Sequence, residues 1–571
     1  MKKIIFPIAF GCMLFSSCSE DLLEIEQKAT SSTATFYKTD EDAKSALTAM
    51  YSQFEDRLAT VRDTYIWNPI MMGLNYNADD VFSAGGDITD HIDFRVMDEF
   101  RYDTKSAPVY QVYQKAYQAI YTANLVIDNF KGEACDTPVK KQCVAEARVM
   151  RAWAHMLLAL TYCQPPLVDH CLDQSEKPTN VESQKFLLDW CATECEEAMS
   201  DLPERKGQSD KEGAYRVTKG FAQFVAGKAA MFAGDNQRSY NNLKPLVESS
   251  NYALVPGERF RDLFHTEGDG CEEKIMEFNY VTNQNIGDSY DMWRGRWMTW
   301  NVLNWRGDDM PAKPLICSCG GWGGGAINDQ FAIKMYEHDG DSYRRKATFL
   351  TPDEFLYDSE LCGWPSDAEC PTLEDKKKDP KRGISQLNGT FSRGIYMEVK
   401  MMMHPNDMGF NDTNNNTNFQ LARLAEAYLL YAEACLNVGK NDEGLKYLNR
   451  IQERSGSGKI SSTLTLTDIQ DEKEYEMWFE GVRFHDIVRW GIAKECFDKV
   501  TDNIPYCYDD FFIEGSEYYH KEHHLRAVTK HPLAEAGYTN RFVVGKHEYW
   551  PIPQDIIDLN HEMHQVRGWA N

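Results

Sequence analysis

Hydrophobic positions recur at intervals of three and four along most of the chain, which is the spacing of one face of a helix. The first such stretch covers residues 43–54, and a second covers residues 109–121. A third runs from about 140 to 162 and ends before Pro165-Pro166, because proline cannot continue a helix. The pattern therefore predicts a mainly α protein.

Two later stretches predict helical hairpins. Residues 219–233 and 237–249 form one pair, with a break at Gly234-Asp235. Residues 422–437 form a second pair with a helix that presents Leu445, Leu448 and Ile451. Small residues where two helices meet, followed by a glycine-bearing turn and an apolar partner, are typical of tetratricopeptide-like hairpins. Since the pairs are scattered along the sequence, we expect supporting hairpins rather than a regular solenoid.

Periodicity is lost between about 256 and 420, where Gly, Pro, Asn and Trp are frequent. Loops held on a rigid scaffold are where binding residues concentrate, so this region is predicted to carry the ligand surface. We expect one unit, residues 18–571, with three parts. These parts are a helical part at 19–255, the loop-rich region at 256–420, and a helical hairpin and tail at 421–571.

The first seventeen residues predict a signal peptide. Lys2 and Lys3 precede a short apolar run at 4–14, which is too short to span a bilayer. Two serines then lead into Cys18, as at a lipoprotein cleavage site where that cysteine carries acyl chains such as palmitate. The alternative is an ordinary signal peptide, 1–17, followed by an incidental cysteine.

Composition narrows the function. The formal charge of −27 disfavours nucleic acid as a partner, because the phosphate backbone is also negative. A hydrophobic content of 42% with 12% aromatic residues excludes global disorder. The chain has no P-loop and no nucleophile elbow, and neither the cysteines nor His561 and His564 have the spacing of a zinc site. No cofactor and no metal are predicted.

Cysteines leave one structural question open. The chain has 16, of which Cys12 and Cys18 fall in the predicted signal and anchor. An exported protein can pair some of the others, although connectivity cannot be read from the sequence. Three pairs are close in sequence: Cys135 with Cys143, Cys163 with Cys171, and Cys362 with Cys370.

Aromatic side chains gather in one part of the loop-rich region. Flat rings match the apolar faces of sugars, and Arg and Asn can bond hydroxyls or carboxylates. The alternatives are that the tryptophans are a buried helix stripe and that the arginines make surface ion pairs. The candidate ligand residues in this cluster are Tyr290, Trp293, Arg294, Arg296, Trp297, Trp300, Trp305 and Trp322.

Four motifs in order along the chain resemble the SusD/RagB family of Bacteroidetes outer-membrane lipoproteins. Lys473 and Met477 stand where the family tends to have Arg and Leu, and Val566-Arg567 interrupts its usual tail. The motifs are AEARVMRA at 145–152 with the Pro-Leu-Val at 166–168, RLAEAYLLYAEA at 423–434, FEGVRFHDIVRW at 479–490, and PIPQDIIDLN at 551–560.

The resemblance implies a mainly helical fold and a cell-surface binding protein that delivers a glycan to a SusC-like TonB-dependent β-barrel transporter. It also implies a lipid anchor in the outer membrane and a surface-export signal in Ser19-Glu20-Asp21. A peptide-binding member of the family is the alternative, and a surface glycan hydrolase is a weaker one. The loop between the first helices is implied to share the ligand face through Tyr65, Trp67, Asn75 and Asp79. The alternative for each of these residues is a packing role.

Overall fold

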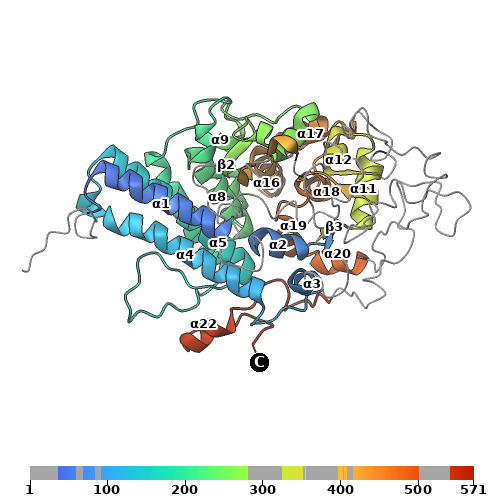
Figure 1. Cartoon of the computed structure of the whole chain (residues 1–571). Coiled ribbons are helices and arrows are strands. Elements are labelled where there is room, and N and C mark those ends of the chain that lie inside the picture. Colours follow the sequence, from blue (N-terminus) through green and yellow to red (C-terminus); the bar gives the residue numbers. More distant parts are fainter. Residues whose placement is uncertain are drawn as a thin grey trace, which may run out of the picture.

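Helices dominate the protein, as the hydrophobic spacing predicts (Figure 1). The structure is a computed structural model that describes residues 36–59, 69–83, 92–280, 325–351, 354, 396–402, 404–407, 416–500 and 541–570. Within those residues, no helix is both long enough and apolar enough to cross a membrane.

The first three predicted helices are confirmed. They are α1 (Asp40–Leu58), α4 (Ala107–Asn129) and α5 (Pro138–Tyr162), which pack on one another. Thr39 begins α1 with a capping box, in which its hydroxyl accepts from the Asp42 N–H and the Asp42 carboxylate accepts from the Thr39 N–H. Next along the frame, α6 (Gln184–Ala198) packs against α5.

Both predicted hairpins are present, and they are neighbours in space. One is α8 (Lys219–Phe232) with α9 (Asn236–Val247), and the other is α16 (Leu424–Asn437) with α17 (Asn441–Ser455). Because α9 packs on α16, the row of helices continues across the long sequence gap between the hairpins. A Cβ on Gly227 would lie 2.4 Å from Leu243 Cγ, so a residue without a side chain lets α8 and α9 approach closely.

Shorter helices complete the described part. The α-helices are α2 (Pro69–Tyr76), α3 (Ile92–Asp98), α7 (Glu212–Tyr215), α11 (Asp329–Asp339), α12 (Tyr343–Thr348), α18 (Leu466–Met477), α19 (Arg483–Arg489), α20 (Ala493–Lys499) and α22 (Gln554–Leu559). The 3-10 helices are η2 (Gly132–Ala134), η3 (Met199–Asp201), η4 (Gly257–Phe264), η5 (Thr266–Gly268) and η11 (Pro405–Asp407).

Within the described ranges, three short antiparallel strand pairs join distant parts of the chain. They are β1 (Val81–Ser83) with β3 (Gly325–Ile327), β2 (Lys274–Phe278) with β6 (Phe419–Arg423), and β4 (Phe349–Leu350) with β5 (Met397–Glu398). The middle of the chain is thus more regular than its sequence predicts, because it also holds α11 and α12. All of β2 is buried, so it has no alternation of polar and apolar residues to reveal it. The domain boundaries stay a prediction.

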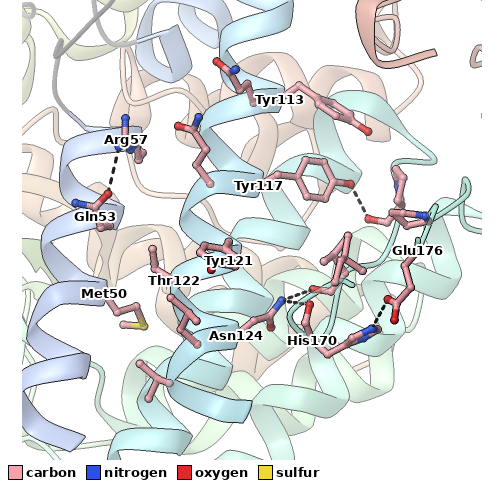
Figure 2. A pocket seen from close by; sticks show the side chains of 18 of the residues that line it. Met50, Gln53, Arg57, Tyr113, Tyr117, Tyr121, Thr122, Asn124, His170 and Glu176 are labelled. Atoms are coloured by element: carbon pink, nitrogen blue, oxygen red, sulfur yellow. Dashed lines mark hydrogen bonds and ion pairs between the residues drawn. The ribbon is translucent and has the colours of Figure 1, made fainter. Parts of the chain in front are cut away.

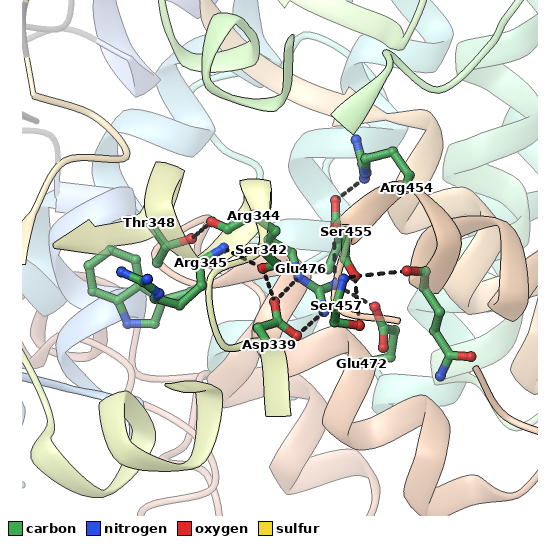
Figure 3. A network of polar contacts seen from close by, with 12 residues as sticks. Asp339, Ser342, Arg344, Arg345, Thr348, Arg454, Ser455, Ser457, Glu472 and Glu476 are labelled. Atoms are coloured by element: carbon green, nitrogen blue, oxygen red, sulfur yellow. Dashed lines mark hydrogen bonds and ion pairs between the residues drawn. The ribbon is translucent and has the colours of Figure 1, made fainter. Parts of the chain in front are cut away.

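Buried ion pairs connect the C-terminal helices to β6. Arg423, at the end of β6, contacts Glu273, Glu476 and Glu480, and all four side chains are at most 4% exposed. A second arginine, Arg344, contacts Asp339, Glu472 and Glu476 (Figure 3). Arginine is suited to such sites because its planar fork can satisfy several carboxylates at once.

The second and third motifs of the family resemblance supply ion-pairing residues of the core. Arg423 of the second motif pairs with Glu480 of the third. Glu433 of the second accepts from Arg489 of the third and, at 3.1 Å, from Trp490 Nε1. Lys473, which departs from the family pattern, places its Nζ 2.6 Å from the Asp486 carboxylate, so the smaller cation keeps an ion pair. Burial opposes ionisation of Asp486, but Lys473 and Arg489 outweigh it and lower its pKa to about 2.

Two of the cysteine pairs that are close in sequence fall in the described residues, and neither forms a disulfide. Cys135, Cys143, Cys163 and Cys171 are all free thiols. Cys143 lies on the buried side of α5, where free cysteine behaves as a small hydrophobic residue. Cys362 and Cys370 lie outside the described residues.

Candidate functional site

Most of the predicted ligand residues lie outside the described part of the chain. This holds for the lipidation candidate Cys18, for Tyr65 and Trp67, and for the whole aromatic cluster between 290 and 322. Their roles stay predictions. What the structure does describe is the frame to which these segments are attached.

The two predicted ligand segments are attached to the same strand pair. The segment that carries the tryptophans follows Tyr280 and ends where β3 begins, and β3 pairs with β1 in the register Val81 to Ile327. The other segment precedes β1, with only α2 and a short turn in between. Backbone pairing therefore joins β1 to β3, which are more than 200 residues apart in the sequence. The Tyr280 N–H donates to Asn418 Oδ1 at 2.9 Å, which holds the other end of the tryptophan segment.

Asn75 and Asp79, the two predicted ligand residues that the structure describes, bond to the third motif. The Asn75 amide donates to the Phe479 carbonyl at 3.2 Å and accepts from the Gly481 N–H at 2.9 Å. Both carboxylate oxygens of Asp79 accept from Arg483, at 2.8 and 2.9 Å. These contacts fix the chain just before β1, which is a positioning role. Direct contact of either residue with a ligand stays a prediction.

The pKa values of two neighbouring carboxyls at this point are shifted in opposite directions. Burial opposes ionisation of Asp79, but the facing Arg483 guanidinium outweighs it and lowers the pKa of Asp79. Burial, together with the charge of Asp79, raises the pKa of Asp80 well above its usual range. Asp80 is 1% exposed, and its carbonyl accepts from Trp478 Nε1 and from the Asn328 N–H. One arginine faces two adjacent acids, so only one of them is held in the charged form.

A wide groove follows the outer side of α4 (Figure 2). Its volume is about 1040 Å³, at the upper end of the roughly 300–1,000 Å³ that is usual for ligand pockets. Met50, Gln53 and Arg57 of α1 form one wall, and the segment with His170 and Glu176 forms the other. Tyr117 and Asn124 bond carbonyls of that second wall, at Pro166 and Val168, and so fix its position. No pattern in the sequence indicates this groove, because its walls come from distant segments.

A third group brings together side chains of the kind that bind metal ions. The potential ligand atoms of His265, His404 and Asp407 lie within 4.8 Å of one another. The two imidazole planes are only 12° from parallel, and their centroids are 3.7 Å apart. A metal ion lies close to the plane of each imidazole that binds it, so one ion cannot serve both rings in this arrangement. The Asp407 carboxylate is also occupied, since it accepts from His265 Nδ1 and from the N–H groups of Thr266 and His404.

Comparison with known proteins identifies the family. Residues 280–569, just over half of the chain, match the SusD family. The chain belongs to the SusD family. Residues 16–200 match a second family, described as starch-binding and associating with the outer membrane. The resemblance drawn from the four motifs is thus confirmed.

Two relatives of this SusD-family chain match it over very different lengths. A SusD-like protein of Bacteroides ovatus is 24% identical over 515 residues, which cover 86% of this chain and 83% of the relative. The starch-binding protein SusD of Bacteroides thetaiotaomicron is 36% identical, but over only 80 residues, or 14% of each chain.

Solved structures agree in fold. A laminarin-binding SusD-like protein has a TM-score of 0.69 at 20% identity, covering 93% of this chain and all of its own. Surface glycan-binding protein A from Bacteroides thetaiotaomicron, in complex with laminarihexaose, has a TM-score of 0.68 at 19% identity, covering 92% of this chain and 99% of its own. The mainly helical SusD-like fold predicted from the sequence is confirmed.

Proposed function

We propose that this SusD-family protein binds glycans at the cell surface without catalysis and delivers them to a SusC-like TonB-dependent transporter. The observation that carries the proposal is the agreement in fold, over more than nine-tenths of the chain, with a protein in complex with laminarihexaose. The aromatic composition of the segment between β2 and β3 supports a sugar as the ligand, since stacked rings give modest affinity at a small entropy cost.

The strand pair β1–β3 supports a composite ligand face. It joins the tryptophan segment to the segment that carries Tyr65 and Trp67, and the Asp79–Arg483 ion pair holds the junction. A rigid frame that holds the ends of two aromatic segments lowers the entropy lost when a ligand is bound. Five tryptophans within 30 residues then offer several stacking positions for a chain of sugars.

Binding is tested with the purified chain on a panel of immobilised polysaccharides that includes laminarin and starch. We expect retention without release of oligosaccharide, and weaker retention in Trp297→Ala and Trp300→Ala. The matched control is Phe186→Ala, which removes an aromatic residue that is 41% exposed on α6, in the helical frame. Unchanged retention in both tryptophan variants would contradict the placement of the site. Released oligosaccharide would favour a hydrolase, and retention of peptides alone would favour the peptide-binding alternative.

The anchor and the transporter are tested separately. We expect the chain produced in its own host to incorporate labelled palmitate and to reach the surface of the outer membrane, and Cys18→Ala to abolish the labelling. We also expect a TonB-dependent β-barrel protein to copurify with the wild-type chain. Recovery of unacylated protein from the cytosol would contradict both the anchor and the proposed location.

A further inference from the structure

Several apolar side chains that line the groove beside α4 are exposed to solvent. Tyr121 is 53% exposed, Leu172 is 40% exposed and Leu559 is 77% exposed, and all three line it. Met50 and Val126 form part of the floor and are 1% exposed. Contiguous exposed apolar residues of this kind usually mark a contact site.

The first residues of the chain that the structure describes lie in the wall of this groove. Phe36 and Tyr37 both line it. Tyr37 has a φ of 69°, a left-handed conformation that is costly for a residue with a side chain. The ring of Tyr37 packs edge-on against Phe36 and Phe130, with centroids 4.6 and 5.7 Å apart, and these contacts stabilise the turn. The position from which the preceding residues start is therefore fixed next to the groove.

The charged residues that line the groove indicate which kind of chain segment it can bind. The protein carries −27 overall, yet the groove is lined by two cations, Lys177 and Arg57, of which Arg57 lies 3.9 Å from the Asp56 carboxylate. Its carboxylate Glu176 is already bonded to His170 Nε2 at 2.7 Å, as Figure 2 shows. Among the described residues, Lys177 makes no ion pair. The groove thus favours a segment that is both apolar and acidic.

We propose that residues 20–26 of this same chain, Glu-Asp-Leu-Leu-Glu-Ile-Glu, occupy the groove. They lie outside the described residues, and the inference rests on their sequence and on where the chain enters. Leu22, Leu23 and Ile25 supply apolar side chains, and the four acids complement the cationic rim. The nine residues 27–35 can span at most about 30 Å, which is enough to turn back along a neighbouring groove.

Docking of this segment would shorten the tether between Cys18 and the helical frame. Contact within one chain is favoured because the tether keeps the segment at a high effective concentration. The closing of such a short loop adds little entropy cost. A docked tether would hold the frame near the acylated end and limit its orientations at the membrane, independently of whether glycan is bound.

Trypsin cleavage after Lys28 measures docking, because a protease needs several flexible residues on each side of the bond. The experiment uses residues 18–571 with Cys18→Ala, so that no detergent is present. We expect Leu23→Asp, in the segment, and Ala49→Glu, in the groove wall, each to accelerate this cleavage roughly tenfold, as loss of one buried leucine contact would. Thr48→Glu is the matched control for Ala49→Glu, since it adds the same charge at an exposed α1 position outside the groove lining. It should leave the rate unchanged.

A photoreactive p-benzoylphenylalanine in place of Leu23 locates the contact. We expect cross-links within the same chain to residues 45–57 and 113–126, and expect Ala49→Glu to abolish them. Equal cleavage rates in all variants would overturn the proposal. So would cross-links that fall outside the groove. Retention of glycan by the same variants distinguishes this result from a failure of the proposed function.

Discussion

The imidazole rings of His265 and His404 stack face to face, with centroids 3.7 Å apart. His265 Nδ1 lies 2.6 Å from Asp407 Oδ2, and the Nε2 atoms of both rings are buried without a hydrogen-bond partner. Burial, followed by the neighbouring His265, lowers the pKa of His404 to about 3. The stack therefore holds His404 neutral in the folded protein.

Acid should weaken the fold through this residue. The unfolded chain takes up a proton on His404 below about pH 6.5, whereas the folded chain resists it, so stability is lost as the pH falls from 6.5 toward 3. His404→Phe keeps a flat ring, and we expect it to reduce the loss of unfolding free energy between pH 7 and pH 5 by up to about 2 kcal/mol. Urea unfolding at both pH values measures the difference. His561→Phe, at an exposed position, is the control. Identical pH dependence in wild type and His404→Phe would refute the prediction.

Removal of Arg423 should lower the free energy of unfolding far more than removal of a surface cation. Arg423→Met leaves Glu273, Glu476 and Glu480 buried with less compensation, and the cost of breaking such a buried group is about 3–5 kcal/mol. Lys44→Met breaks an ion pair with Glu41 that is largely exposed, and should change stability little. Denaturant midpoints compare the two variants. Similar midpoints would mean that the buried network adds no stability.

The contact between Gly73 and Trp550 should tolerate no added methyl group. A Cβ on Gly73 would lie 2.3 Å from Trp550 Cη2, and the indole is fixed by its Nε1 bond to Asn77 at 2.7 Å. We expect Gly73→Ala to destabilise the protein by about 1–3 kcal/mol. Trp550→Phe removes the clashing atom, so the double variant should be more stable than the sum of the two single effects predicts. Simple additivity in thermal melts would show that the clash is relieved elsewhere.

The cysteines of α6 should react only after unfolding. Cys191 and Cys195 are fully buried, and burial raises the pKa of each thiol well above its usual range. Without reductant, iodoacetamide should modify neither in the folded protein and both in urea, as mass spectrometry of peptides would show. Cys163 and Cys171 should also be modified in urea, and their protection there would reveal a disulfide that contradicts the structure.

The motifs can be recognised in the sequence, but the contacts that their residues make cannot. The alternation of alanine with Glu426 and Glu433 indicates a packed helix, whereas their ion-pair partners Lys228 and Arg489 are contributed by other helices. The same applies to Asn75 and Asp79. The resemblance implies that both lie on the ligand face, and the described structure uses both to attach the chain to the third motif.

The positions of the long N-terminal helices could be predicted from the sequence alone. The spacing of apolar residues placed α1, α4 and α5, and the Pro165-Pro166 pair predicted the end of α5 at Tyr162, because helix formation depends on residues three and four apart. Only tertiary structure decided the pairing of β1 with β3, the groove beside α4 and the stacking of His265 on His404. Each of these joins residues far apart in the chain, and the free energy that selects them comes from burial and charge pairing in the assembled core, which no local pattern records.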